Sequence, residues 1–505
     1  MASTAHGRLL ARYLDVTRTL TEASETNQHK SSKSPNTCAI AHHESLGHLA
    51  DNGNPSQNEV KDTDPTAAAM IQLLARQAHA LVTIHKLLAL DEDADIVNED
   101  LLQNRLAVVI SISSSKFYAY RYDLLPAVWR KIYTDACILD SFRLVLRPLA
   151  TTRPLPEDVL DVVVEKLDRA LITAGGGGRQ RWLEETLGLL EEAWTAGEQN
   201  KRPAKRQRYA TSSPQNFSSY EPYGRPHLSS ERECPRCSDW TMPQFEDYMN
   251  NNDGRPRPIV FTDLIRDWSA LTDRPWKRPE YLLSKTFGGR RLVPVEIGRS
   301  YVDEGWGQDL IQFREFLSRY VQGDSSTSST GYLAQHNLFQ QIPSLRNDIC
   351  IPDFCWVDVP PHPTTPSLNQ PPVDMPQLNA WFGPARTITP LHTDGYHNLL
   401  CQVVGTKYIR LYPPSATPWM RPRAPEHGVD MSNTSGLDVG VLEGWDERPE
   451  DMSDEDVTRM REDLEGVEYW ECILEPGDTL VIPIGWWHYV RSLSASFSVS
   501  FWWNS

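Results

Sequence analysis

Residues 391–400 read LHTDGYHNLL and place an imidazole and a carboxylate two positions apart in a largely apolar stretch. In a β-strand, side chains two positions apart point to the same face. If this stretch ends a strand, His392 and Asp394 project into one space. A divalent metal held by these two groups would still lack a third protein ligand. The best candidate is His488, which follows another strand-like run, GDTLVIPIGWW, much later in the chain.

These three residues form a recognisable donor set for a metal. Two histidines and one carboxylate on one face of a metal leave the opposite coordination positions open, as in non-haem iron(II) oxygenases. HxD alone is common by chance, whereas HxD with a distal histidine beside a strand that follows a Pro-Gly-Asp turn is more specific. The pattern therefore predicts a metal site and directs attention to the strands around it.

The composition of the chain bounds its class. At 505 residues it is long enough for two or more domains, each with its own core. No run of about 18 apolar residues occurs, so we expect no membrane-spanning segment. The formal net charge of −17 disfavours nucleic acid as a direct partner. The eight scattered cysteines are more typical of a reduced intracellular protein than of a disulfide framework.

The N-terminal part of the chain divides into three segments. Residues 1–64 contain a long stretch rich in Ser, Asn, Thr and charge, and we expect this segment to be largely disordered. Residues 65–198 repeat apolar positions at three- and four-residue spacing, which predicts a helical domain. Residues 199–232 form a linker in which KRPAKRQR is either a nuclear-import signal or solvated charge. We expect the protein in the nucleus, the cytoplasm or both.

From residue 233 the sequence changes to short runs rich in β-branched and aromatic residues, separated by Pro and Gly. Examples are RPIVFTDL, RRLVPVEIG, KYIRLYP and FSVSFWW. They predict an all-β sandwich or barrel, with helices near 279–286 and 309–321. The whole chain is thus expected to be α+β, with an all-helical N-terminal domain and a β-rich domain over residues 233–505.

Within the β-rich domain, residues 422–471 read as an acidic insertion. This segment holds 16 acidic residues and 4 basic ones. One interpretation is a solvated loop. The other is an acidic rim around a pocket, which would attract basic peptides.

Two long stretches resemble the JmjC-domain family of iron(II)- and 2-oxoglutarate-dependent oxygenases. They are WFGPARTITPLHTDGYHNLLCQVVGTKYIRLYPP and LEPGDTLVIPIGWWHYVRSLSASFSVSFWW. The likeness extends upstream through RPIVFTDLIRDW, RRLVPVEIGRSYVDEGWGQ and GYLAQHNLFQQIPSLRNDICIPDFC, and covers residues 233–505. The set looks like the subgroup described both as protein-arginine hydroxylase and as lysine demethylase 8. It implies a double-stranded β-helix, the jelly-roll or cupin-like fold, for the C-terminal domain.

The resemblance also implies the cofactors and the residues that hold them. The implied iron(II) ligands are His392, Asp394 and His488. 2-Oxoglutarate would chelate the iron, with dioxygen as cosubstrate, and the far carboxylate of 2-oxoglutarate would meet the ammonium of Lys407. The side chains at matching positions that would donate further hydrogen bonds to 2-oxoglutarate are Tyr332, Thr389 and Asn398.

The implied reaction is hydroxylation of a side chain in a basic protein or peptide. Glu296 in VPVEIG and Trp381 in WFGP match family positions on the substrate side. A carboxylate pairs with a guanidinium and an indole face stacks on it, which favours an arginyl substrate. The alternative is N-methyl hydroxylation, as in a histone lysine demethylase. A non-enzymatic alternative is a chromatin-associated scaffold that keeps the JmjC fold.

We expect the protein to be a monomer. Some JmjC hydroxylases carry a C-terminal helical dimerisation domain, whereas this chain ends two residues after FWW. Light scattering should give a mass near the 57.4 kDa of one chain at every concentration. A mass near twice that value, independent of concentration, would contradict the expectation.

Overall fold

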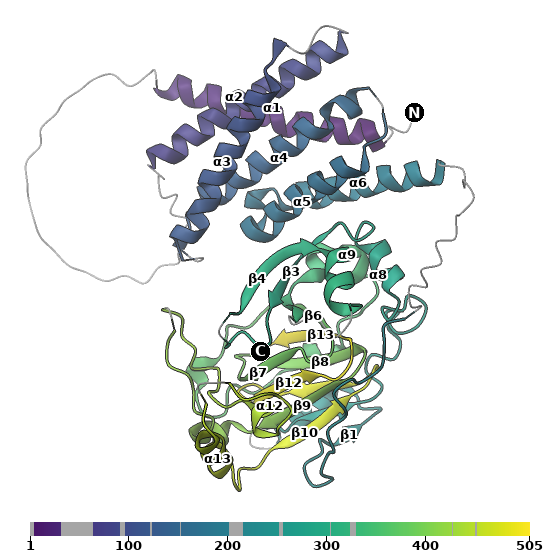
Figure 1. The fold of residues 1–505 in the computed structure, drawn as a ribbon, viewed down its shortest axis with the longest axis vertical. Helices are drawn as coiled ribbons and strands as arrows, with labels where there is room; N and C mark the ends of the chain where they lie inside the picture. The colour runs from purple at the N-terminus through teal and green to yellow at the C-terminus, as the bar shows by residue number, and fades with distance from the viewer. Residues whose placement is uncertain are drawn as a thin grey trace, which may run out of the picture. The chain divides into compact units, whose positions relative to one another are not determined.

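A computed structural model describes most of the chain, in two compact units over residues 1–207 and 208–505 (Figure 1). The described residues are 5–31, 64–90, 96–121, 124–151, 153–200, 216–251, 256–303, 305–323, 330–426, 428–449 and 452–505. The basic cluster KRPAKRQR lies outside them, so a nuclear or cytoplasmic location stays a prediction.

The first unit consists of helices packed around α4. Its helices are α1 (Ala5–Ser31), α2 (Pro65–Ala89), α3 (Glu99–Ala119), α4 (Ala127–Ala150), α5 (Glu157–Ala174) and α6 (Gln180–Asn200). Helix α4 packs against α1, α2, α3 and α5, and buries Trp129 and Phe142 completely. The glycine run 175–178 ends α5, because Gly175 adopts the left-handed conformation (φ 59°) that glycine tolerates best.

Part of the segment over residues 1–64, for which we expect largely disordered chain, is helical: residues 5–31 form α1. Leu9, Tyr13 and Val16 recur at four- and three-residue spacing and are buried. The Tyr13 ring stacks on Phe142 in α4, with 5.0 Å between ring centroids. The polar composition of the whole segment hid this short apolar stripe, which becomes stable only against α4. Residues 32–63 lie outside the described part of the chain.

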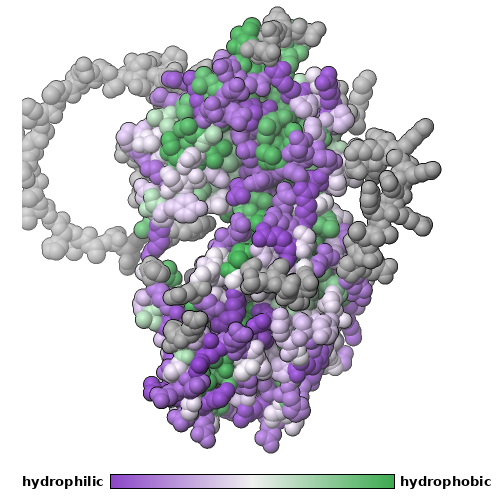
Figure 2. Space-filling view, viewed as in Figure 1, coloured by the Kyte–Doolittle hydropathy of each residue, from purple (hydrophilic) through white to green (hydrophobic). Residues whose placement is uncertain are grey.

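Helix α2 is the one described helix that is long and apolar enough to cross a membrane by length and composition. In this structure Leu74, Ala78 and Leu81 of α2 are buried, and the helix packs against α1 and α4. Core helices of helical bundles share this length and composition, and in this structure α2 is a core helix. In Figure 2 apolar residues also gather in patches on the surface of this unit. Its exposed apolar side chains include Leu101 and Val108.

The second unit is built from two β-sheets. Its strands are β1 (Arg236–Cys237), β2 (Ile259–Phe261), β3 (Leu292–Ile297), β4 (Gly307–Gln312), β5 (Gly331–His336), β6 (Gln377–Gly383), β7 (Ile388–His392), β8 (His397–Val404), β9 (Lys407–Tyr412), β10 (Trp470–Leu474), β11 (Thr479–Ile482), β12 (Trp487–Ser492) and β13 (Ser496–Trp503). One sheet has the order β1-β2-β11-β8-β13-β6-β5-β3-β4, and the other has the order β10-β9-β12-β7. All neighbouring strands are antiparallel except β1 and β2.

The two sheets enclose an apolar core. Leu400 and Leu480 from the larger sheet pack with Ile409 and Leu411 from the smaller one. Strands β8, β9, β12 and β13 are buried along their whole length, although each contains polar residues among its apolar ones. The predicted α+β class, with a helical N-terminal domain and a C-terminal jelly roll, is confirmed.

Short helices connect the strands. They are α7 (Met242–Asn250), α8 (Pro279–Lys285), α9 (Phe313–Phe316), α10 (Leu338–Gln341), α11 (Pro343–Arg346), α12 (Val439–Leu442) and α13 (Asp454–Asp463). The helix expected near 279–286 is α8. The helix expected over 309–321 starts only at Phe313, because residues 307–312 pair with β3 as strand β4.

The acidic segment is folded onto the second unit and includes α12 and α13. Its predicted end at residue 471 lies inside strand β10, where Glu471 is buried and accepts a hydrogen bond from Tyr408 Oη at 2.7 Å. Asp446 anchors the middle of the segment. It accepts from Arg491 Nη1 at 2.7 Å and lies 3.4 Å from the guanidinium groups of Arg299 and Arg386. Burial alone would raise the pKa of Asp446, but the three arginines outweigh it and hold the pKa below its usual value.

Replacing Asp446 by alanine should therefore destabilise the second unit by about 3–5 kcal/mol, because it leaves buried guanidinium charge without a partner. The full loss of unfolding free energy should be seen at neutral pH. It should shrink as the pH falls below about 4, where the unfolded-state carboxyl is already protonated. Urea unfolding at pH 7 and pH 3 measures both effects. The exposed Glu455→Ala is the matched control and should change stability by less than about 0.5 kcal/mol; equal effects of the two variants would contradict the anchoring role.

Candidate functional site

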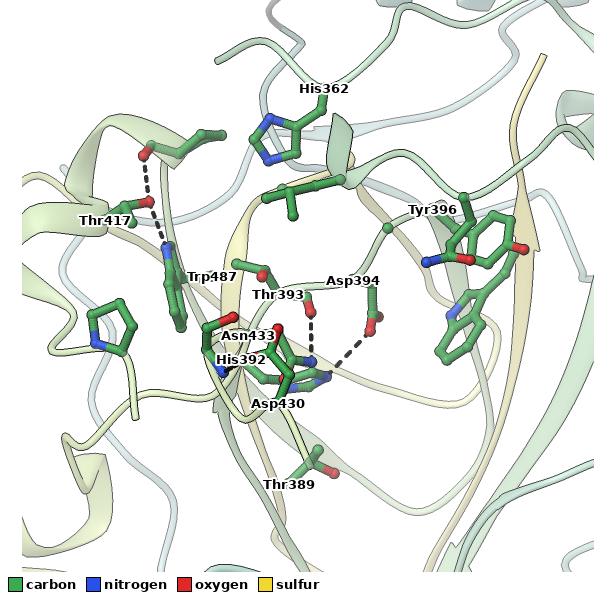
Figure 3. Close-up of a pocket in the computed structure, with 18 of the residues that line it drawn as sticks. His362, Thr389, His392, Thr393, Asp394, Tyr396, Thr417, Asp430, Asn433 and Trp487 are labelled. Carbon is green, nitrogen blue, oxygen red and sulfur yellow. Dashed lines mark hydrogen bonds and ion pairs between the residues drawn. The ribbon is translucent and has the colours of Figure 1, made fainter. Parts of the chain in front are cut away.

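The three predicted metal ligands lie together at one end of the smaller sheet. His392 is the last residue of β7, and its register partner on β12 is His488. The two imidazole centroids are 4.1 Å apart. Asp394 follows β7 directly, with its carboxylate oxygens 3.7 Å from His392 Nε2 and 3.6 Å from His488 Nε2. Figure 3 shows Asp394 turned towards His392 at the floor of a cleft.

Hydrogen bonds to the backbone assign the tautomers of both histidines. Nδ1 of His392 donates to the carbonyl of Pro390 at 2.8 Å, and Nδ1 of His488 donates to the carbonyl of Trp486 at 3.0 Å. Each Nε2 therefore presents a lone pair to the shared space. Burial lowers the pKa of His488 and keeps its imidazole neutral, as a metal ligand must be. One ligand atom from each of the three residues lies within 4.8 Å of the others, so the donor set fits a divalent metal.

A buried ammonium group lies further along the same sheet. Lys407 opens strand β9 and is 1% exposed. Its Nζ donates to the Tyr332 hydroxyl at 3.3 Å, and no carboxylate in the described part of the chain pairs with it. Burial lowers the pKa of Lys407 to about 7. A buried cation without a counter-charge is costly, so the site is suited to an anionic ligand.

A small cavity joins Lys407 to the metal-ligand residues. Its lining includes all seven residues predicted for iron and 2-oxoglutarate: Tyr332, Thr389, His392, Asp394, Asn398, Lys407 and His488. Oδ1 of Asn398 is buried and has no hydrogen-bond partner within the described ranges. The hydroxyls of Tyr332 and Thr389 are hydrogen-bonded to each other and face the same space. A dicarboxylate that reached from a metal to Lys407 would meet these polar groups.

A cleft of about 1050 Å³ opens outside this cavity and shares Tyr332, Trp381 and the metal-ligand end of β7 with it. Both residues predicted for the substrate side, Glu296 and Trp381, line the cleft. Burial raises the pKa of Glu296. The Trp381 indole N–H donates to Ser500 Oγ at 2.9 Å, which orients its ring.

Several cleft residues were missed in the sequence. They are Tyr301, His362, Trp487, Asp430 and Asn433. Asn433 belongs to the acidic segment, which pairs with the end of β7: Thr393 N–H donates to the Asn433 carbonyl at 2.8 Å, and Ser435 N–H donates to the Leu391 carbonyl at 2.8 Å. No local sequence pattern predicts this pairing.

The acidic segment contributes less charge to the cleft than an acidic rim requires. Asp430 is its one acidic residue in the described lining of the cleft. Asp454, Glu455 and Asp456 instead form the first turn of α13, where Asp456 completes a capping box with Ser453. Acidic side chains in the first turn stabilise a helix, because its N-terminus carries a partial positive charge. The segment as a whole is therefore a structural wall of the cleft with a single acidic side chain in it.

Comparison with known proteins agrees with this geometry. Residues 244–505 match a family model described as a cupin-like domain. The chain is 33% identical over 400 residues to lysine-specific demethylase 8 of Danio rerio, which covers 79% of this chain and 87% of the relative. The chain belongs to the JmjC oxygenases. It is also 33% identical over 391 residues to Jumonji C domain-containing protein 5 of Drosophila melanogaster (77% and 84% covered) and 42% identical over 248 residues to lysine-specific demethylase JMJ30 of Arabidopsis thaliana (49% and 50% covered).

Membership of this family makes the chain an oxidoreductase, since JmjC oxygenases use 2-oxoglutarate and iron(II). The family resemblance predicted from the motifs around HTD and WWH is thus confirmed.

For Lys407, we predict that 2-oxoglutarate binding takes up a proton at pH 8. In the free protein most Lys407 side chains are neutral at that pH, because burial lowers the pKa to about 7. A bound carboxylate favours the ammonium form and draws a proton from solution. Titration calorimetry with manganese(II) in place of iron(II), in two buffers of different ionisation enthalpy, measures the uptake.

The Lys407→Met variant should lose this proton uptake and bind 2-oxoglutarate at least about thirtyfold more weakly. Lys277→Met, at an exposed position in the same unit, is the control and should behave as the wild type. Undiminished uptake in Lys407→Met would show that another group receives the proton.

Proposed function

We propose that this JmjC oxygenase hydroxylates an arginyl side chain of a protein substrate. In this proposal the iron(II) ligands are His392, Asp394 and His488. The residues that hold 2-oxoglutarate are Lys407, Tyr332, Thr389 and Asn398. Bound iron(II), with dioxygen and 2-oxoglutarate, supplies the oxidant that replaces a C–H hydrogen by hydroxyl while 2-oxoglutarate becomes succinate and carbon dioxide.

The protein's own part in this chemistry is to position the reactants and to exclude water. The backbone carbonyls that receive Nδ1–H keep His392 and His488 in the ligating tautomer. Lys407 and Tyr332 hold the far carboxylate in an enclosed, apolar setting, where a charge-assisted hydrogen bond is strong. Leu400, Ile482 and Val490 close the sides of the cavity and keep solvent away from the reacting atoms.

The observation that carries the choice of substrate is the state of Glu296. Its carboxylate is partly buried in the cleft wall and accepts a hydrogen bond from the Trp306 side chain, and no described basic residue forms an ion pair with it. A partly buried carboxylate without a cationic partner is costly, and a cationic substrate side chain would reduce that cost. Trp381 offers an aromatic face in the same cleft, and a planar guanidinium both stacks on indole and pairs with a carboxylate.

Demethylation of a methylated lysine is the second candidate. Two of the relatives are named lysine-specific demethylases, and a methylated ammonium would also be attracted by Glu296 and by an aromatic face. A non-enzymatic scaffold is less well supported, because the complete donor set and a buried Lys407 that no described carboxylate pairs with both cost stability.

The two reactions leave different mass signatures. The chain should be incubated with iron(II), 2-oxoglutarate and matched peptides that contain a central arginine or a central methylated lysine. We expect the arginine peptide to gain one oxygen atom, and Asp394→Ala to abolish this gain while the fold is retained. Loss of a methyl group from the lysine peptide, with the arginine peptide unchanged, would replace the proposal by the second candidate.

Glu296→Gln tests the substrate contact directly. It keeps the shape of the side chain but removes its charge, so kcat/KM for the arginine peptide should fall by roughly 10- to 100-fold, the cost of one charge-assisted hydrogen bond. The affinity for 2-oxoglutarate should not change. Glu455→Gln, exposed on α13, is the control. An unchanged kcat/KM in Glu296→Gln would remove the argument for a cationic substrate.

A further inference from the structure

A proline-rich loop forms a wall of the cleft that the sequence motifs do not explain. It reads VDVPPHPTTPSLNQPPVDMP over residues 357–376 and leads into β6. The side chains that it contributes to the cleft lining are His362, Thr364, Thr365, Leu368 and Gln370. None of these residues is assigned a role in the reaction proposed above.

The loop is held against the residues that follow the metal-ligand strand β7. Gln370 N–H donates to the Gly395 carbonyl at 3.1 Å. The Asn504 side-chain amide donates to the carbonyls of both Gln370 and Gly395 at 2.9 Å. The Pro360 carbonyl accepts from His397 Nε2 at 2.8 Å. Since Gly395 is the neighbour of Asp394, these bonds fix the loop relative to the three metal-ligand residues.

The protonation of His362 follows from its contacts within the loop. Nδ1 accepts the backbone N–H of Thr365 at 3.0 Å and of Thr364 at 3.3 Å. A ring nitrogen that accepts two N–H groups carries no proton, so the proton of the neutral ring lies on Nε2. Burial lowers the pKa of His362, which keeps the ring neutral. His362 is therefore a fixed N–H donor.

The ring of His362 rests on Gly485, and this contact sets the direction of the donor. A Cβ atom at Gly485 would lie 2.2, 2.5 and 2.9 Å from Nε2, Cδ2 and Cε1. The two ring carbons bonded to Nε2 lie almost as close to this Cβ position as Nε2 does, which an approach along the Nε2–H bond would not allow. The Nε2 side of the ring face therefore covers Gly485, and the Nε2–H bond, in the ring plane, points past it. In Figure 3 one ring nitrogen of His362 is turned towards the side of the cleft where His392 and Asp394 lie. No hydrogen-bond partner of Nε2 is present in the described residues.

We propose that His362 donates its Nε2–H to a main-chain carbonyl of the bound peptide and so positions the peptide backbone across the cleft. This inference rests on the proposed peptide substrate. A neutral N–H donor cannot receive the basic side chain, which itself carries only donors, so the basic group is directed to Glu296 on another wall. Main-chain carbonyls are present in every peptide, and His362 would thus act on KM with little dependence on the sequence of the substrate.

Two substitutions separate this role from the structural role of His362 in the loop. The amide oxygen of His362→Asn can take the place of Nδ1 and accept the backbone N–H groups, but the side chain is too short to donate into the cleft. The amide nitrogen of His362→Gln reaches the place of Nε2 and keeps a donor there. The pair therefore removes one function at a time. The probe is the arginine-centred peptide of the mass-shift assay, without acidic residues.

We expect His362→Asn to raise KM for the peptide about three- to tenfold, the loss of one neutral hydrogen bond, with kcat and the affinity for 2-oxoglutarate unchanged. His362→Gln should stay within about twofold of the wild-type KM. A wild-type KM in His362→Asn, or a raised KM in His362→Gln alone, would overturn the proposal and leave His362 as a loop residue only.

The failure of the proposed function would look different. In that case the wild-type chain would modify no arginine peptide in the mass assay, and both proposals would fall together. Thermal melting of both His362 variants shows whether either one perturbs the fold, and a large loss of stability in His362→Asn with unchanged KM would also count against the contact.

Discussion

The register between β7 and β12 is the constraint on which the site depends. Antiparallel pairing places His392 opposite His488, and the residues after β7 bring Asp394 to the same point. The next strand, β9, pairs with β12 so that Leu411 lies opposite His488 and Lys407 opposite Ser492. Lys407 and Leu411 are four residues apart on one face, roughly 13 Å along the strand. One small sheet thus sets the distance between the metal-ligand end and the buried cation. A shift of one residue would turn His392 or His488 to the other face.

The polar groups of the cavity are organised before any ligand arrives. Among the described residues, Lys407 has no counter-charge and Oδ1 of Asn398 has no hydrogen-bond partner, although both are buried. Each unsatisfied group costs stability in the free protein, and the surrounding apolar core offsets this cost. A ligand that satisfies these groups recovers the cost on binding, so the protein should be most stable when the cavity is filled.

The walls of the cleft come from segments outside the two sheets. The acidic segment pairs with the end of β7 through residues 433–435. At a second point, Asp446 anchors it through ion pairs with three arginines. The proline-rich loop joins the residues after β7 from the other direction through Gly395. Both therefore use the chain around the metal-ligand residues as an anchor. Such a scaffold keeps the chemistry in the strands and allows the loops to choose the substrate.

Much of the site could be predicted from the sequence, because its residues lie in strands with a clear local pattern. The HxD pair, the distal histidine and the β-rich runs pointed to the metal-ligand residues, and the family resemblance pointed to the residues of the inner cavity. The sequence also indicated the helical first unit, apart from α1, whose short apolar stripe lies in a polar segment and is stabilised by packing on α4.

Only the tertiary structure decided what surrounds the site. Residues 433–435 pair with β7 about forty positions away, and the His362 ring fits over Gly485, far along the chain, because glycine leaves room for it. Neither relation has a local pattern, since both depend on backbone groups and on the absence of a side chain. The charge of residues 422–471 is plain in the sequence, whereas the placement of Asp430 in the cleft and of Asp454–Asp456 in a helix cap followed from folding alone. Local patterns record which face of a strand or helix is buried, and they do not record which distant segment covers it.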